Sequence, residues 1–141
     1  MRAPALSLPL YIVDASAWSR YGTRIAVTEY IDEVVSRGLI MTCPPASLEY
    51  CFMARNKAEH DVFRSRMANF KQPDRHPAVS DVLAIQSALW GSGLVRAAGS
   101  LDTLIASYAL LHNATIISCD RDYAHISTAL DGALNYVHLH P

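Results

Sequence analysis

Residues 8–14 read Leu-Pro-Leu-Tyr-Ile-Val-Asp, a short apolar run that ends at an acidic residue. A run of this length, rich in β-branched and aromatic side chains, predicts a strand that is buried on both faces. Three similar runs follow, and each predicts another short strand: residues 39–43, 114–119 and 136–139. The chain is therefore expected to contain a sheet built from short strands that lie far apart in sequence.

Segments with helical spacing of apolar residues separate these runs. They predict helices over 27–37, 79–90, 101–112 and 121–130, and another that begins at Pro44-Pro45 and extends to Phe70, either continuous or broken once. Gly38 supplies the end of the first helix, and Leu101, Leu104 and Tyr108 lie on one face of the helix over 101–112. Strands that alternate with helices predict βαβ units, and hence a parallel sheet flanked by helices.

Length and composition favour one compact domain spanning residues 1–141. The 141 residues are 51% hydrophobic and 18% charged, so the chain can bury a sizeable core and is not disordered. The formal net charge of −1 excludes a global basic field. The stretch 55–75 nevertheless carries six Lys or Arg against three Asp or Glu, which fits either a local polyanion-binding surface or a solvated helix face.

The N-terminal segment imitates a secretory signal, because an apolar stretch precedes Ala15-Ser16-Ala17. Pro9 interrupts that stretch and Asp14 lies beside the apparent cleavage site, so we expect no secretion. The three cysteines lack the spacing of a disulfide framework or a zinc site, and no apolar run approaches the roughly 20 residues of a membrane span. We expect a cytoplasmic protein without a membrane segment.

Four acidic residues occupy special positions in this pattern. Asp14 and Asp120 follow predicted strands, Glu49 lies about one turn into a helix, and Asp102 lies at the start of another. The carboxyl ends of parallel strands share one edge of a sheet, so Asp14, Glu49 and Asp120 are expected to meet there, and Asp102 can join them if its helix starts on that side. Each acid alone could instead be a turn former or a helix cap. Together they predict a site for Mg²⁺ or Mn²⁺, ions suited to phosphodiester hydrolysis.

Four blocks of sequence resemble the PIN-domain ribonucleases, and in particular the VapC toxins of VapBC toxin–antitoxin modules. The blocks are Tyr11-Ile12-Val13-Asp14-Ala15-Ser16-Ala17, Glu49 with Arg55-Asn56, Leu101-Asp102-Thr103-Leu104-Ile105-Ala106 with 111–115, and Ile117-Ser118-Cys119-Asp120-Arg121-Asp122-Tyr123. Their order and spacing cover nearly the whole chain. The resemblance implies a three-layer α/β/α PIN-like domain with a central parallel sheet of four or five short strands.

The resemblance also implies a function. Such a protein would be a Mg²⁺-dependent endoribonuclease toxin, usually a homodimer, inhibited by a cognate VapB antitoxin whose tail enters the active-site groove. Asp14 and Asp102 would be the principal metal ligands. Glu49 and Asp120 would complete the cluster, directly or through waters.

Three further residues match polar positions of the family. The hydroxyls of Ser16 and Ser118 would bind a carboxylate or a water beside the metal. Asp122 alternates with Asp120, which leaves open which of the two faces the metal; Asp120 is preferred because it lies nearer the strand end.

Arg20, Arg24, Arg55 and Lys57 follow acid-bearing segments and are candidates for contacts with RNA phosphates. Ordinary surface charge is the alternative for each of them. Two other functions stay open for the chain as a whole. One is a PIN-like module that has lost catalysis and only docks a partner, and the other is a different Mg²⁺-dependent phosphoryl-transfer α/β domain.

Overall fold

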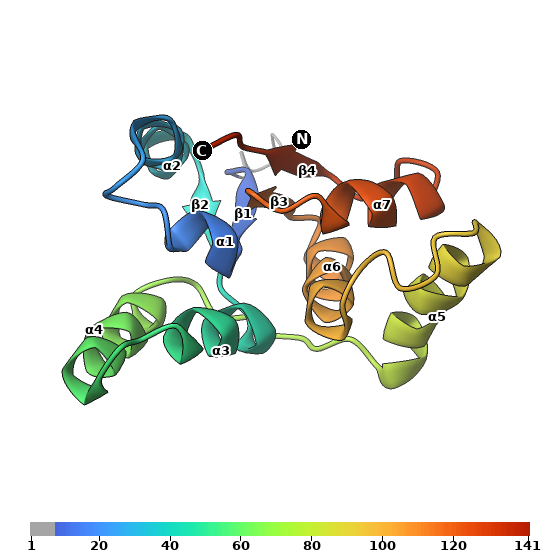
Figure 1. Cartoon of the computed structure of the whole chain (residues 1–141), viewed down its shortest axis with the longest axis horizontal. Helices are drawn as coiled ribbons and strands as arrows, with labels where there is room; N and C mark the ends of the chain where they lie inside the picture. The colour runs from blue at the N-terminus through green and yellow to red at the C-terminus, as the bar shows by residue number, and fades with distance from the viewer. Residues whose placement is uncertain (1–7) are drawn as a thin grey trace, which may run out of the picture.

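The computed structural model describes residues 8–141 and shows an α/β domain (Figure 1). Its strands in chain order are β1 (Leu10–Val13), β2 (Leu39–Ile40), β3 (Thr115–Ser118) and β4 (Tyr136–His138). Its helices are α1 (Ala15–Trp18), α2 (Ile25–Arg37), α3 (Pro44–Phe52), α4 (Lys57–Ala68), α5 (Val79–Gly91), α6 (Ser100–His112) and α7 (Asp122–Ala129). In this part of the chain every helix is too short or too polar to span a bilayer.

The strands form one parallel sheet in the order β2-β1-β3-β4. The two central strands, β1 and β3, are in register such that Tyr11 pairs with Thr115 and Val13 with Ile117. The predicted parallel sheet is confirmed, with four strands within residues 8–141. Since β1 and β3 lie side by side at the centre, the residues that follow them, Asp14 and Cys119, emerge at the same edge.

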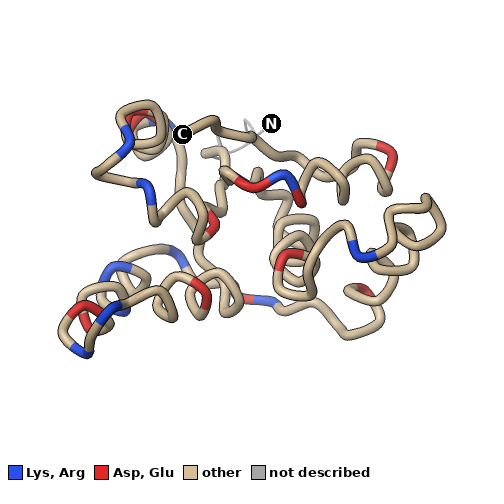
Figure 2. Tube along the Cα trace, in the orientation of Figure 1, with Lys and Arg blue, Asp and Glu red and all other residues tan. Residues whose placement is uncertain are grey.

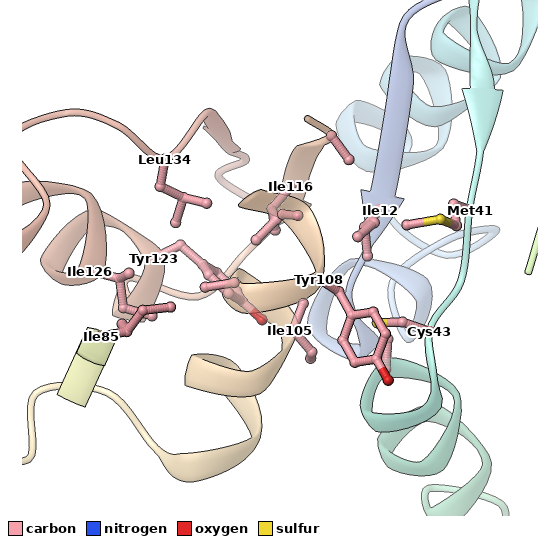
Figure 3. Packing of buried hydrophobic residues seen from close by; sticks show 14 of the residues in the cluster. Ile12, Met41, Cys43, Ile85, Ile105, Tyr108, Ile116, Tyr123, Ile126 and Leu134 are labelled. Atoms are coloured by element: carbon pink, nitrogen blue, oxygen red, sulfur yellow. The ribbon is translucent and has the colours of Figure 1, made fainter. Parts of the chain in front are cut away.

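Helices cover both faces of this sheet, which confirms the three-layer expectation. Ile12 and Ile116 point into one buried cluster, together with residues of α5, α6 and α7 (Figure 3). Their neighbours Val13 and Ile117 point into a second cluster, together with residues of α1, α2 and α3. Successive strand residues face opposite sides, so a continuous apolar run is what a sheet buried twice requires.

The second strand is shorter than its apolar run predicts. Only Leu39 and Ile40 pair with β1 as a regular strand. Beyond them Met41 forms an isolated bridge with Lys71, and the Thr42 N–H donates to the Lys71 carbonyl at 3.0 Å. The residues after Ile40 stay buried and extended by pairing with the loop after α4, a contact that apolar spacing does not reveal.

The predicted helix over 44–70 is two helices that meet at a corner. Pro44 and Pro45 occupy the first positions of α3, where proline lacks only an N–H that would have no partner anyway. The chain leaves the helix after Phe52, and Asn56 starts α4 by accepting a hydrogen bond from the Glu59 N–H at 2.8 Å. The break therefore coincides with a strong N-cap residue.

Candidate active site

Asp14 ends β1 and caps the short helix that follows. Its backbone is extended, and its Oδ1 accepts hydrogen bonds from the Ser16 hydroxyl at 2.6 Å and the Ala17 N–H at 3.2 Å. The residue is only 4% exposed. Burial raises the pKa of this carboxyl, the hydrogen bonds counteract the shift, and the charge of Asp120 adds to it.

Two serines join the ends of the central strands. The Ser118 hydroxyl at the end of β3 donates to Asp14 Oδ2 at 2.8 Å and accepts from the Asp120 N–H at 2.8 Å. The Ser16 Oγ accepts from the Cys119 N–H at 2.9 Å and lies 3.1 Å from the Ser118 Oγ. These contacts hold Asp14 rigidly and set the direction of the chain that carries Asp120.

Asp102 enters the same site from the first turn of α6. One oxygen each from Asp102, Asp120 and Asp122 lies within 4.8 Å of the others. The pKa of Asp102 is raised to about 8. The largest cause is burial, followed by the hydrogen bond and charge of Asp122 and then the charges of Glu49 and Asp120. Without a metal, this carboxyl therefore keeps its proton to a higher pH than an ordinary aspartate does.

Glu49 completes the group from α3. Its Oε1 is buried and has no hydrogen-bond partner within residues 8–141. Burial raises its pKa, and the charges of Asp14 and Asp120 raise it further. An unpartnered buried carboxylate oxygen is costly unless a cation or an ordered water completes it.

The structure thus brings all four predicted acids together, with Asp122 as a fifth. The pKa values of Asp14, Glu49 and Asp102 are raised by burial and by the charges of neighbouring acids, and Asp120 is one of these neighbours in each case. Figure 2 shows the acid-bearing segments of β1, α3, α6 and the β3–α7 turn around the centre of the molecule. Asp120 and Asp122 both lie in the group, so the geometry does not select one over the other.

These residues fit a divalent metal ion. The donors are carboxylate oxygens, which Mg²⁺ and Mn²⁺ prefer. Three of them already lie close enough to share one ion, and the unpartnered Glu49 Oε1 offers another. A bound cation would also lower the raised pKa values, because it favours the charged carboxylates.

Tyr123 is a site residue that motif reasoning assigned no role. It is fully buried, and its hydroxyl donates to Asp102 Oδ1 at 3.3 Å. Burial and the charges of Asp14, Asp102 and Glu49 raise its pKa well above the usual value. The phenol therefore keeps its proton and can orient Asp102. The feature of the sequence that could have pointed to this role is the position of an aromatic residue directly after Asp122.

The four candidate RNA contacts do not lie together. Arg20 lies beside the segment that follows Asp14, since one guanidinium N–H donates to the Ser16 carbonyl at 2.7 Å. Arg24 is exposed at the start of α2. Arg55 and Lys57 lie at the α3–α4 corner, where each pairs with an acid four residues later.

Comparison with known proteins supports this architecture. The sequence model described as PIN domain matches residues 11–129. Similar solved structures include VapBC2 from Rickettsia felis bound to a DNA fragment from their promoter, with a TM-score of 0.70 at 14% identity, covering 92% of this chain and 98% of that one. No curated protein sequence matches the chain.

Two other solved structures have the same fold. FitAcB from Neisseria gonorrhoeae gives a TM-score of 0.66 at 17% identity, covering 91% of this chain and 96% of that one. VapBC-5 from Mycobacterium tuberculosis gives 0.63 at 20% identity, with 92% and 98% covered. At these identities the likeness concerns the fold alone.

Proposed function

This chain belongs to the PIN domain family, and from that premise we propose that it is a divalent-metal-dependent endoribonuclease toxin that hydrolyses RNA phosphodiester bonds. The observation that carries the proposal is the group of five carboxylates, among which burial and neighbouring acids raise the pKa values of Asp14, Glu49 and Asp102. A protein that only docked a partner would gain nothing from this repulsion. A metal-dependent nuclease needs such a group of mutually repelling carboxylates in order to bind its ion.

In this proposal Asp14 and Asp102 are the principal ligands of Mg²⁺ or Mn²⁺, and Glu49 and Asp120 complete the cluster directly or through waters. When bound, such an ion supplies polarisation of a phosphoryl oxygen and a more acidic water. Glu49 Oε1, which has no protein partner within residues 8–141, accepts a hydrogen bond from the attacking water. A carboxylate with a raised pKa is a better general base near neutral pH.

The residues around the ligands have an orienting role. Ser16 and Ser118 fix both oxygens of Asp14, and Tyr123 and Asp122 lie against Asp102. Residues in such positions typically change metal affinity or activity by about 10- to 100-fold when they are lost.

For partners, we propose RNA as the substrate, a cognate VapB-type antitoxin as the inhibitor, and a homodimer in the cytoplasm. The antitoxin is supported by the similar structures, which are named as VapBC assemblies. Arg20 is placed to contact a phosphate next to the acids, because its guanidinium is anchored to the segment that holds Asp14. Arg24, Arg55 and Lys57 would act further along the RNA.

The test is RNA cleavage during titration with Mg²⁺ and then Mn²⁺. We expect no cleavage in a chelator, and a loss of at least about 100-fold for Asp14→Asn and for Asp102→Asn, because each removes a metal ligand. Glu29→Gln is the matched control, since Glu29 is an exposed acid on α2. Circular dichroism should show that all three variants are folded.

Two outcomes would count against the proposal. Cleavage at the wild-type rate by both Asn variants would remove the acids from the mechanism. Absence of metal-dependent cleavage in the wild-type protein would favour a catalytically silent PIN-like module.

A further inference from the structure

The corner between α3 and α4 forms an open hollow of about 560 Å³. Its lining includes Phe52 from the end of α3, Arg55 from the turn, and Lys57, His60, Asp61 and Arg64 from α4. None of the five acids of the candidate active site lines it. We call this surface the corner hollow.

Positive charge dominates the corner hollow. Lys57, His60 and Arg64 follow a spacing of three and four residues, which places them on one face of α4. All three act on the same acid: the hydrogen bond from Lys57 is the largest influence on the pKa of Asp61, which is lowered, and His60 and Arg64 contribute to that shift. Figure 2 shows Lys and Arg gathered along α4.

The existing ion pairs leave these cations available. Arg55 lies 2.9 Å from Glu59 and Lys57 lies 2.6 Å from Asp61, and both basic side chains are more than four-fifths exposed. Ion pairs between exposed side chains are weak because water screens the two charges. A phosphate could therefore replace Asp61 as the partner of Lys57, because both side chains of this pair are well exposed. Arg64 has no ion-pair partner within residues 8–141.

Phe52 adds an aromatic face to this charged surface. Its side chain is 89% exposed, the largest value among the exposed large apolar residues of the described chain. An exposed phenyl ring alone needs no explanation. An exposed ring next to a row of cations has the two elements with which proteins bind single-stranded nucleic acid, a stacking platform and contacts to the backbone.

Helix α3 links the corner hollow to the acids. Glu49 lies in the candidate active site, and Phe52 is three residues further along the same helix, a rise of roughly 4.5 Å. A single strand held at the acids can therefore continue into the corner hollow within a few nucleotides.

We propose that the corner hollow is a second RNA-binding site, where an unpaired base stacks on Phe52 and neighbouring phosphates contact Lys57 and Arg64. The proposal rests on the proposed function, because it takes single-stranded RNA to be the substrate. It gives a role to basic residues of α4 and of the turn before it, in a chain with a net charge of −1.

The experiment measures binding of a fluorescein-labelled single-stranded RNA 12-mer by anisotropy, in a chelator so that no metal-dependent cleavage takes place. We expect Phe52→Ala to weaken binding about tenfold, because stacking on an aromatic side chain is worth that much per base. Arg64→Gln should reduce the slope of log affinity against log salt by about 0.7, the value for one phosphate contact on a single strand.

The matched controls are Trp90→Ala, which removes another exposed aromatic ring from α5, and Arg96→Gln, which removes an exposed cation before α6. Both should bind the 12-mer within about twofold of wild type. Equal affinity for Phe52→Ala and Trp90→Ala would overturn the proposal. So would a Phe52→Ala variant with unchanged RNA affinity and an altered sedimentation coefficient, which would assign the surface to a second copy of the chain.

Failure of the proposed function has a separate signature. RNA would then bind through Phe52 in the chelator, but the wild-type protein would not cleave it when Mg²⁺ or Mn²⁺ is added.

Discussion

One buried hydroxyl holds the candidate active site together at the residue scale. Ser118 is fully buried, donates to Asp14 and accepts from the Asp120 N–H. The family resemblance implied a hydroxyl beside a carboxylate or a water at this position. The structure adds that the same oxygen also sets the backbone direction at Asp120, so that one side chain orients two acids from different strands.

Replacing Ser118 with Ala should impair both activity and stability. Asp14 would lose a donor and the Asp120 N–H would lose its acceptor. We expect activity to fall about 10- to 100-fold and the free energy of unfolding to fall by about 1–3 kcal/mol. Metal-dependent RNA cleavage and urea denaturation measure the two effects.

Thr128→Ser is a suitable control, because the exposed Thr128 hydroxyl contacts only the Ala124 carbonyl and the substitution keeps it. Equal activity of Ser118→Ala and the wild-type protein would show that Asp14 needs no help from this hydroxyl.

At the element scale, the junction between α2 and β2 shows why a correct helix end can have an unexpected cause. Gly38 was expected to end the helix, as glycine often does in a left-handed conformation. Its φ is −148°, which is extended backbone that any residue adopts. Glycine is required for space instead, since a Cβ would lie 2.7 Å from the Tyr11 ring and 2.8 Å from the Pro9 carbonyl oxygen.

Gly38→Ala should therefore destabilise the domain by about 1–3 kcal/mol, the usual cost of forcing an extra carbon into a packed site. Thermal unfolding should show a lower midpoint than wild type. Gly91→Ala is the matched control, because an added Cβ there meets nothing within 4 Å and alanine suits the end of α5. Equal midpoints for the two variants would contradict the packing argument.

Helix α6 was predicted with almost correct bounds, and Ile105 and Tyr108 of its expected face are buried, but the rest of the buried face differs. Leu101 is 44% exposed and Leu104 only partly buried, whereas Thr103, Ala106 and Ala109 are buried. Small side chains let the helix approach β1 and β3 closely. This close approach brings the first turn, with Asp102, to the sheet edge where Asp14 lies.

At the scale of the whole molecule, acidic and basic side chains lie in different places, although the net charge is only −1. Five acids meet at one edge of the sheet, whereas Lys57, Arg64 and Arg66 lie on α4. The acids repel one another in the metal-free protein, which therefore retains protons that an unfolded chain would release.

This repulsion gives a defined pH dependence of stability. Asp102 has a folded-state pKa of about 8 against about 3.9 in an unfolded chain, and the pKa values of Asp14 and Glu49 are also raised. Between about pH 4 and 8 the folded state binds more protons, so the unfolding free energy falls as pH rises. In a chelator, the unfolding midpoint should drop by several degrees over this range.

Saturating Mg²⁺ or Mn²⁺ should raise the midpoint and reverse most of this decline, because the cation replaces the protons. Asp102→Asn should flatten the decline in the chelator. Calorimetry over the pH range provides the measurement. A midpoint that rises with pH in the metal-free protein would show that the acids do not repel as the geometry requires.

The sequence by itself determined the order of the elements and predicted which acids would lie together. Continuous apolar runs predict strands buried on both faces, and the rule that parallel strand ends share an edge was enough to group Asp14, Glu49 and Asp120, with Asp102 joining them if its helix started on that side. Both rules depend only on local sequence or on topology, so they hold even where the predicted bounds of β2 and α6 are inexact.

Only the tertiary structure decided the contacts between distant segments. These include the Ser118 bridge to Asp14, the Tyr123 hydroxyl on Asp102 and the pairing of Met41 with Lys71. It also decided that the chain turns between α3 and α4, with Asn56 at the start of α4, and that this turn forms the corner hollow. The physical reason is that periodicity records which face of an element is apolar, whereas hydrogen bonds, close approach and mutual repulsion depend on how the faces meet in space.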